Sequence, residues 1–265
     1  MYTEELNIDA HTIISAKTRY LTQRQARTPN QAMNDLARLA KRPLPVLNIV
    51  TDRESALLIG QITLTETYDP VAAALRYVRD GVDAIAMFTD QRVYSKGMDD
   101  LLLVSRGISS PILCQDYIIS EYHVAEARAA GASALVLYAS LLERPVLRRV
   151  VSTVQRWRMT AIVQVNSAQE LEFAASLSPH VICIGLEPSF DRERDLTLLE
   201  DLLPYIPYNT KVMALGCMHS LEDVETIAGL RLDAVIVDEK LIKSPSTLER
   251  MRELLHYDDE DSSVF

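Results

Sequence analysis

The chain has 265 residues, of which 48% are hydrophobic, and its formal net charge is −10. This composition predicts a globular protein with a substantial core. The acidic balance argues against nucleic-acid and membrane-binding surfaces, which need clusters of lysine and arginine. No apolar run in the sequence reaches the roughly 18 residues of a membrane span, and the polar segment 1–5 does not resemble a secretory signal. We expect a cytoplasmic protein.

The cysteines are odd in number and far apart in the sequence, at Cys114, Cys183 and Cys217. This spacing favours reduced, packed thiols over disulfides or a zinc site. The chain also lacks the G-x-G-x-x-G turn of a dinucleotide-binding unit. We therefore expect no cofactor.

Short runs rich in Val, Ile and Leu alternate with helical patterns, which is typical of repeated βα units and a parallel sheet. Eight strands, each followed by a helix, favour a closed (β/α)8 TIM barrel over an open doubly wound sheet. The strands are expected at residues 56–62, 84–88, 112–115, 134–138, 161–165, 181–184, 211–214 and 234–237. The helices are expected at residues 70–79, 98–106, 121–130, 142–157, 168–175, 196–203, 221–228 and 246–255.

The pattern divides the chain into three parts. Residues 1–50 form a helical extension, with amphipathic helices at 10–28 and 31–41 and Asn30 as a candidate cap of the second. Residues 51–256 form the barrel. Residues 257–265 are acidic and too polar to pack, so we expect a disordered tail. An acidic run that ends in Val-Phe could also act as a docking peptide.

The sequence Ser-Pro-Ile-Leu-Cys-Gln-Asp-Tyr-Ile-Ile at residues 110–119 resembles the third strand of the indole-3-glycerol phosphate synthase family, which reads roughly P-[IV]-L-x-K-D-F-I. The resemblance extends over residues 13–245 and is also carried by segments 69–70, 88–90, 216–224 and 235–245. It implies a (β/α)8 barrel with N-terminal helices. It also implies a lyase that closes and decarboxylates a carboxyphenylamino-deoxyribulose phosphate in tryptophan biosynthesis.

The resemblance places the family's catalytic residues at strand ends that have changed in this chain. The third-strand lysine, the family's general acid, corresponds to Gln115, whose amide has no titratable proton near neutral pH. The glutamate and lysine of the first strand correspond to Gly60 and Ile62. The fifth-strand glutamate corresponds to Gln164, and the sixth-strand asparagine to Gly185. No catalytic residue of the family is retained at these positions.

The family's phosphate-binding positions have changed as well. The sixth-strand arginine corresponds to Glu187, and the seventh strand keeps only Gly216. The eighth-strand glycine, where backbone amides hold the phosphate, is replaced by Asp238, and Glu239 follows it. Carboxylates at this rim would repel a phosphate dianion.

These substitutions favour a family member that has lost the ring-closure reaction, a pseudoenzyme with a binding or regulatory role. A genuine synthase with an unorthodox site is one alternative. A barrel enzyme with new chemistry is the other, since carboxylates and an imidazole at one rim could bind a divalent metal or an amine. The same groups could equally be separately solvated loop charges. The candidates for this rim are Glu187, His219, Asp238 and Glu239.

Neutral side chains at the strand ends have two interpretations. Gln115, Gln164, Asn166 and Tyr138 could line the mouth and bind a small uncharged ligand, or they could satisfy one another in a plugged barrel.

A protein partner could dock on the acidic tail, on the N-terminal helices or on the basic face of helix 142–157. That face carries Arg144, Arg148, Arg149 and Arg156, and it could equally be a solvated surface.

Overall fold

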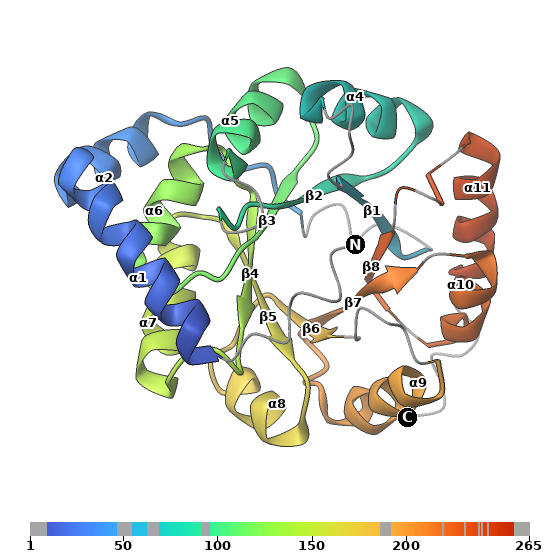
Figure 1. Cartoon of the computed structure of the whole chain (residues 1–265). Helices are drawn as coiled ribbons and strands as arrows, with labels where there is room; N and C mark the ends of the chain where they lie inside the picture. Colours follow the sequence, from blue (N-terminus) through green and yellow to red (C-terminus); the bar gives the residue numbers. More distant parts are fainter. Residues whose placement is uncertain are drawn as a thin grey trace.

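The computed structural model describes residues 10–46, 55–62, 69–91, 96–185, 192–218, 220–230, 232–237, 239, 241–242 and 244–256. Within them, parallel strands pair in the order β1 to β8, and β8 returns to β1 to close a barrel (Figure 1). The predicted (β/α)8 barrel with N-terminal helices is confirmed. No helix in the described ranges is both long and apolar enough to cross a membrane. The acidic segment 257–265 lies outside these ranges, so its expected disorder stays a prediction.

The strands lie where the apolar runs place them. The ends differ from expectation by at most one residue, except that β7 continues four residues further. The strands are β1 (Leu57–Ile62), β2 (Ala84–Phe88), β3 (Ile112–Gln115), β4 (Ala134–Tyr138), β5 (Thr160–Val165), β6 (Val181–Gly185), β7 (Lys211–Met218) and β8 (Ala234–Val237).

Helices follow the strands in sequence and cover the outside of the barrel (Figure 1). The helices are α1 (Ala10–Arg27), α2 (Asn30–Leu39), α4 (Pro70–Asp80), α5 (Gly97–Gly107), α6 (Glu121–Ala129), α7 (Arg144–Arg156), α8 (Ala168–Ala175), α9 (Arg192–Leu202), α10 (Leu221–Ile227) and α11 (Pro245–Leu254).

Side-chain caps explain where several of these helices begin. The Asp69 carboxylate accepts two first-turn backbone amides at the start of α4. At the other end of that helix, Gly81 has φ of 109°, a left-handed conformation that favours glycine. Serine side chains cap α6, α8, α10 and α11 in the same way as Asp69, at Ser120, Ser167, Ser220 and Ser244.

Alternation along the strands produces two apolar layers. One face of each strand packs against the helices, as Leu58 and Ile85 do. The opposite face fills the barrel interior, as Ile59, Ala86 and Val136 do. The phase of this alternation decides which residue at each strand end faces the mouth.

The N-terminal helices pack against one side of the barrel (Figure 1). α2 lies against α6, and their contact buries Met33 and Ala37 with Tyr122. The expectation that Asn30 caps α2 is wrong. The cap position is Pro29, and Asn30 is the first helical residue, where its Oδ1 accepts a hydrogen bond from Gln25 instead.

Candidate functional site

The mouth of the barrel, at the carboxyl ends of the strands, is where active sites of (β/α)8 barrels lie. In β1, Ile59 belongs to the interior layer, and Gln61 pairs with the interior residue Ala86. Gly60 therefore faces the helices, where an added Cβ would meet Tyr77, and Ile62 shares that face. The expectation that Gly60 and Ile62 occupy mouth positions is therefore wrong. The residue of β1 that faces the mouth is Gln61.

Gln115 ends β3 and pairs with Phe88 of β2 and with Val136, which lies inside the barrel. Its side chain is 3% exposed, and its Oε1 has no hydrogen-bond partner. A buried carbonyl oxygen without a donor is uncommon in folded proteins, and it marks a place for a ligand or a water molecule. The structure thus places Gln115 at the mouth, as the sequence predicts.

Three aromatic rings lie together at the ends of β2, β3 and β4. The Tyr117 ring meets the Phe88 ring edge-on, with centroids 6.1 Å apart, and its centroid lies 5.1 Å from that of Tyr138. Such arrangements are favourable for aromatic pairs. Burial raises the pKa of the Tyr138 hydroxyl well above its ordinary value, so this group stays protonated and can donate a hydrogen bond.

The end of β5 carries two further amides, Gln164 and Asn166. Gln164 of β5 pairs in register with Tyr138 and with Cys183, so it also faces the interior. Its Nε2 donates to Oδ1 of Asn166 at 3.4 Å, and its Oε1 is buried without a partner. A Cβ on Gly185 would overlap with both amides. Gln164 and Asn166 therefore occupy the space that a side chain at Gly185 would need.

The structure brings together only part of the predicted site. Gln115, Gln164, Asn166, Gly185 and Tyr138 meet at the mouth. The ends of β1 to β6 that face it carry neutral side chains only: Gln61, Phe88, Gln115, Tyr138, Gln164 and Gly185.

The predicted acidic rim is mostly untested. Glu187, His219 and Asp238 lie outside the described residues, and for Gly216 only its place within β7 is described. Glu239 forms an ion pair with Arg76 of α4 at 2.6 Å, and this contact raises the pKa of the arginine despite some burial. No group of three metal-ligating side chains occurs among the described residues.

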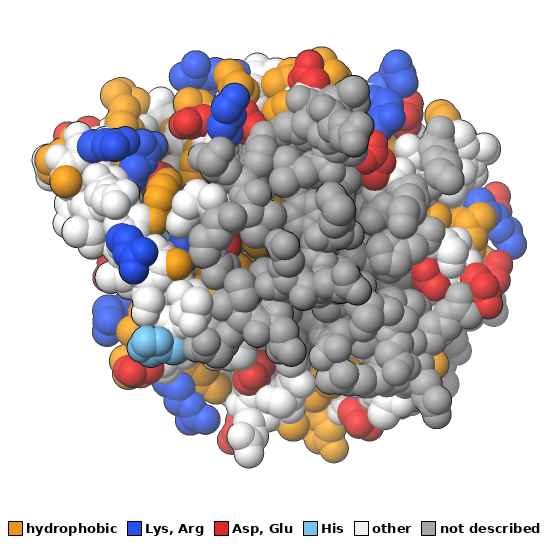
Figure 2. All heavy atoms as spheres, in the orientation of Figure 1, with side chains coloured by type: hydrophobic (Ala, Val, Ile, Leu, Met, Phe, Trp, Pro, Cys, Tyr) orange, Lys and Arg blue, Asp and Glu red, His pale blue; other side chains and the backbone are white. Residues whose placement is uncertain are grey.

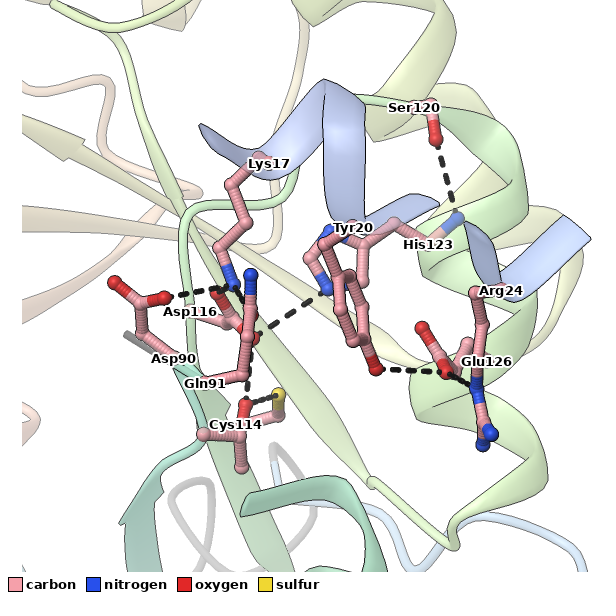
Figure 3. Close-up of polar contacts among 11 residues, drawn as sticks. Lys17, Tyr20, Arg24, Asp90, Gln91, Cys114, Asp116, Ser120, His123 and Glu126 are labelled. Atoms are coloured by element: carbon pink, nitrogen blue, oxygen red, sulfur yellow. Dashed lines mark hydrogen bonds and ion pairs between the residues drawn. The ribbon is translucent and has the colours of Figure 1, made fainter. Parts of the chain in front are cut away.

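A buried ion cluster that sequence reasoning missed lies outside the barrel wall, beneath α1 (Figure 3). Lys17 is completely buried and reaches from α1 to two carboxylates. Its Nζ lies 3.2 Å from Asp90, forms a close ion pair with Asp116, and donates to Oε1 of Gln91 at 2.8 Å. Asp116 follows Gln115, so alternation points it away from the mouth.

Asp116 is the centre of this cluster. It accepts a hydrogen bond from Thr89 at 2.9 Å, and Nε2 of the buried His123 lies 3.4 Å from it. Burial opposes ionisation of Asp116, but His123 and Lys17 outweigh that effect and hold its pKa well below the usual range. The neighbouring Cys114 is a free, buried thiol whose pKa is raised by burial and by Asp116.

The cluster links α1 to the ends of β2 and β3 through Lys17. One signal in the sequence could have revealed it. Lys17 stands between Ile13 and Leu21 at four-residue spacing, on the buried stripe of an amphipathic helix. A lysine on such a stripe requires buried anionic partners.

Comparison with known proteins agrees with this fold. The model of the indole-3-glycerol phosphate synthase family matches residues 12–254. A protein of Mycolicibacterium smegmatis named indole-3-glycerol phosphate synthase is 30% identical over 223 residues, which cover 80% of this chain and 82% of the relative. A Dehalococcoides mccartyi protein of the same name is 31% identical over 191 residues, covering 71% of this chain and 74% of the relative. The chain therefore belongs to the indole-3-glycerol phosphate synthase family.

Proposed function

We propose that this family member binds a small uncharged ligand at the barrel mouth and does not carry out ring closure and decarboxylation. The observation that carries the proposal is the pair of neutral amides, Gln115 and Gln164, at strand ends where the family resemblance expects a lysine and a glutamate.

The described ends of β1 to β6 at the mouth carry no side chain that could act as a general acid or base near neutral pH. An amide neither donates nor accepts a proton near neutral pH, and general acid–base catalysis by a positioned group typically contributes about 10²–10⁴-fold in rate. Lys17 does not substitute for the missing lysine, because its ammonium is held between Asp90 and Asp116 outside the barrel wall. The described groups at the mouth thus support binding rather than proton transfer.

The hydrogen-bonding pattern of the mouth favours one class of ligand. Oε1 of Gln115 and Oε1 of Gln164 are buried acceptors without donors, so a ligand that donates through N–H or O–H would satisfy them. The rings of Tyr117 and Tyr138 offer an aromatic surface beside these acceptors. An uncharged planar molecule that carries hydrogen-bond donors fits both features.

The test combines turnover with binding. Purified protein is incubated with the carboxyphenylamino-deoxyribulose phosphate, and indole fluorescence is followed with the M. smegmatis relative as a positive control. Calorimetric titrations with the same compound and with phenol and aniline measure binding. We expect no detectable turnover, and weak binding of the uncharged rings that Gln115→Leu abolishes. Gln23→Leu, an exposed glutamine on α1, is the matched control.

Two outcomes would contradict the proposal. Turnover by the unmodified chain would identify a genuine synthase with an unorthodox site, consistent with the names of its relatives. Binding of phenol and aniline that Gln115→Leu leaves unchanged would place these rings elsewhere on the molecule.

A further inference from the structure

A groove between α7 and α8 carries an uncompensated basic cluster. Its cavity volume is about 650 Å³, and it is lined by Arg144, Arg148 and Arg149 of α7 together with Glu172 and Phe173 of α8. All three arginines are exposed. None of them forms an ion pair with a carboxylate among the described residues, and the Arg144 guanidinium lies 5.0 Å from the centroid of the Phe173 ring.

The charges in the first turns of α7, which line this groove, destabilise the helix. Arg144 stands in the first turn, where the positive end of the helix dipole disfavours cations, and that turn has no acidic residue. Arg148 follows four residues later, a spacing at which like charges repel. Glu143 at the N-cap is the nearest acidic residue, but its side chain caps no backbone amide, and residues 144–156 contain no acidic residue. An anionic occupant of the groove would remove both penalties.

Arg156, which the sequence grouped with these arginines, does not belong to the cluster. It lies at the other end of α7 and pairs with Glu121 of α6 at 3.1 Å. The unpaired charge is thus confined to the groove beside α8. Basic side chains are visible at this edge of the molecule, at the lower left of Figure 2.

We infer that the groove between α7 and α8 binds the acidic segment 257–265 of a second copy of this chain. That segment has the complementary chemistry, since four consecutive acidic residues, 258–261, are followed three residues later by Val264 and Phe265. The acidic side chains match the three arginines, and an aromatic residue matches the Phe173 surface. On a chain with a net charge of −10, a groove that carries three arginines attracts such an acidic segment.

The reach of the chain selects a second copy over the same copy. Asp261 is five residues beyond His256, where the described part ends, so it lies within about 18 Å of it. α11, just before His256, is separated from α8 by α10 and α9, and from α7 by α4, α5 and α6. With neighbouring helices about 8–10 Å apart, the shorter path is at least about 24 Å. Reciprocal exchange of the segment between two copies closes a symmetric dimer.

The experiment uses complementary charge reversals in the full chain. One variant carries Arg148→Glu and Arg149→Glu, and the other carries Asp258→Lys and Asp259→Lys. Sedimentation velocity measures association of the parent, of each variant and of their equimolar mixture at low salt. We expect a parent dimer, at least a tenfold weaker association of each variant alone, and a heterodimer in the mixture, because only the mixed pair matches opposite charges in both grooves.

Control variants distinguish binding of segment 257–265 in the groove from a general effect of net charge on association. Lys41→Glu with Arg42→Glu reverses two adjacent exposed charges before the barrel, and it should leave association unchanged. A chain that ends at His256 should be monomeric, and circular dichroism should show that every variant folds. A monomeric parent, a dimer that persists without residues 257–265, or a mixture that associates no better than its components would overturn the inference.

Discussion

Lys17→Met removes the ammonium from the buried ion cluster while it keeps most of the side-chain stem that packs under α1. Two carboxylates then remain: Asp90, completely buried, and Asp116, 1% exposed. Removing one partner of a buried ion pair typically costs about 3–5 kcal/mol, because the other charge is left uncompensated. Here one cation serves two carboxylates, and Nε2 of His123 lies 3.4 Å from Asp116 as a further neighbour. We therefore expect a loss toward the upper end of that range.

The measurement is urea unfolding at neutral pH, with Arg19→Met as the control on the same helix. Arg19 is exposed, so its replacement should change the free energy of unfolding by less than about 0.5 kcal/mol. Hydrogen exchange should also show that the amides of α1 lose protection first, since Lys17 is the ionic link between this helix and the ends of β2 and β3. A loss of less than about 1 kcal/mol for Lys17→Met would refute the reasoning.

The pH dependence of the free energy of unfolding gives an independent check on the role of Lys17. The pKa of Asp116 is lowered in the folded chain, so its stabilising contribution is complete above the ordinary value of 3.8 and is lost as the pH falls below it. Without Lys17 the pKa of Asp116 rises, and protonation relieves the uncompensated charge at a higher pH. The stability difference between parent and Lys17→Met should therefore be largest near neutrality and shrink in acid. A difference that grows in acid would contradict this account.

Three further substitutions test packing and capping, each by urea or thermal unfolding. Gly185→Ala should cost about 1–3 kcal/mol, because the new methyl overlaps with the amide of Gln164, and the double variant with Gln164→Ala should recover part of that loss. Gly97→Ala should cost more than Gly185→Ala, since its methyl would meet the backbone of Thr89, which cannot rotate away. Asp69→Ala should cost about 1 kcal/mol through the lost cap of α4, and Asp69→Asn should restore most of it.

The barrel could be predicted from sequence because its signals are local and repeated. Apolar runs such as those of β2, β3, β4 and β8 begin and end at the expected residues. Which side chains of β1 point into the barrel could not be predicted in the same way. In Leu57 to Ile62 the only polar side chain is that of Gln61, and one polar residue near the end of a strand does not establish an alternating pattern. Only pairing with β2 and β8 shows that Gln61 faces the mouth.

The ion cluster was missed for a related physical reason. Its members come from α1, the ends of β2 and β3, and α6, so the partners are distant in sequence and meet only in the closed barrel. Lys17 alone carries a local signal, its place on a buried stripe. The neutral ends of β3, β5 and β6 were easier to predict, because Gln115, Gln164 and Gly185 stand at strand ends and their own chemistry is visible in the sequence.

Adjacent residues at the end of β3 show how the chain separates stability from its site. Asp116 points outward, is buried, and is matched by Lys17 and His123 at the contact with α1. Gln115 points into the mouth, is equally buried, and leaves its oxygen unmatched. A buried ion needs partners that compensate its charge. A neutral amide that is buried without a hydrogen-bond donor has a smaller free-energy penalty. Charge at this strand end therefore stabilises the contact with α1, and the neutral amide beside it is the group that we propose binds an uncharged ligand.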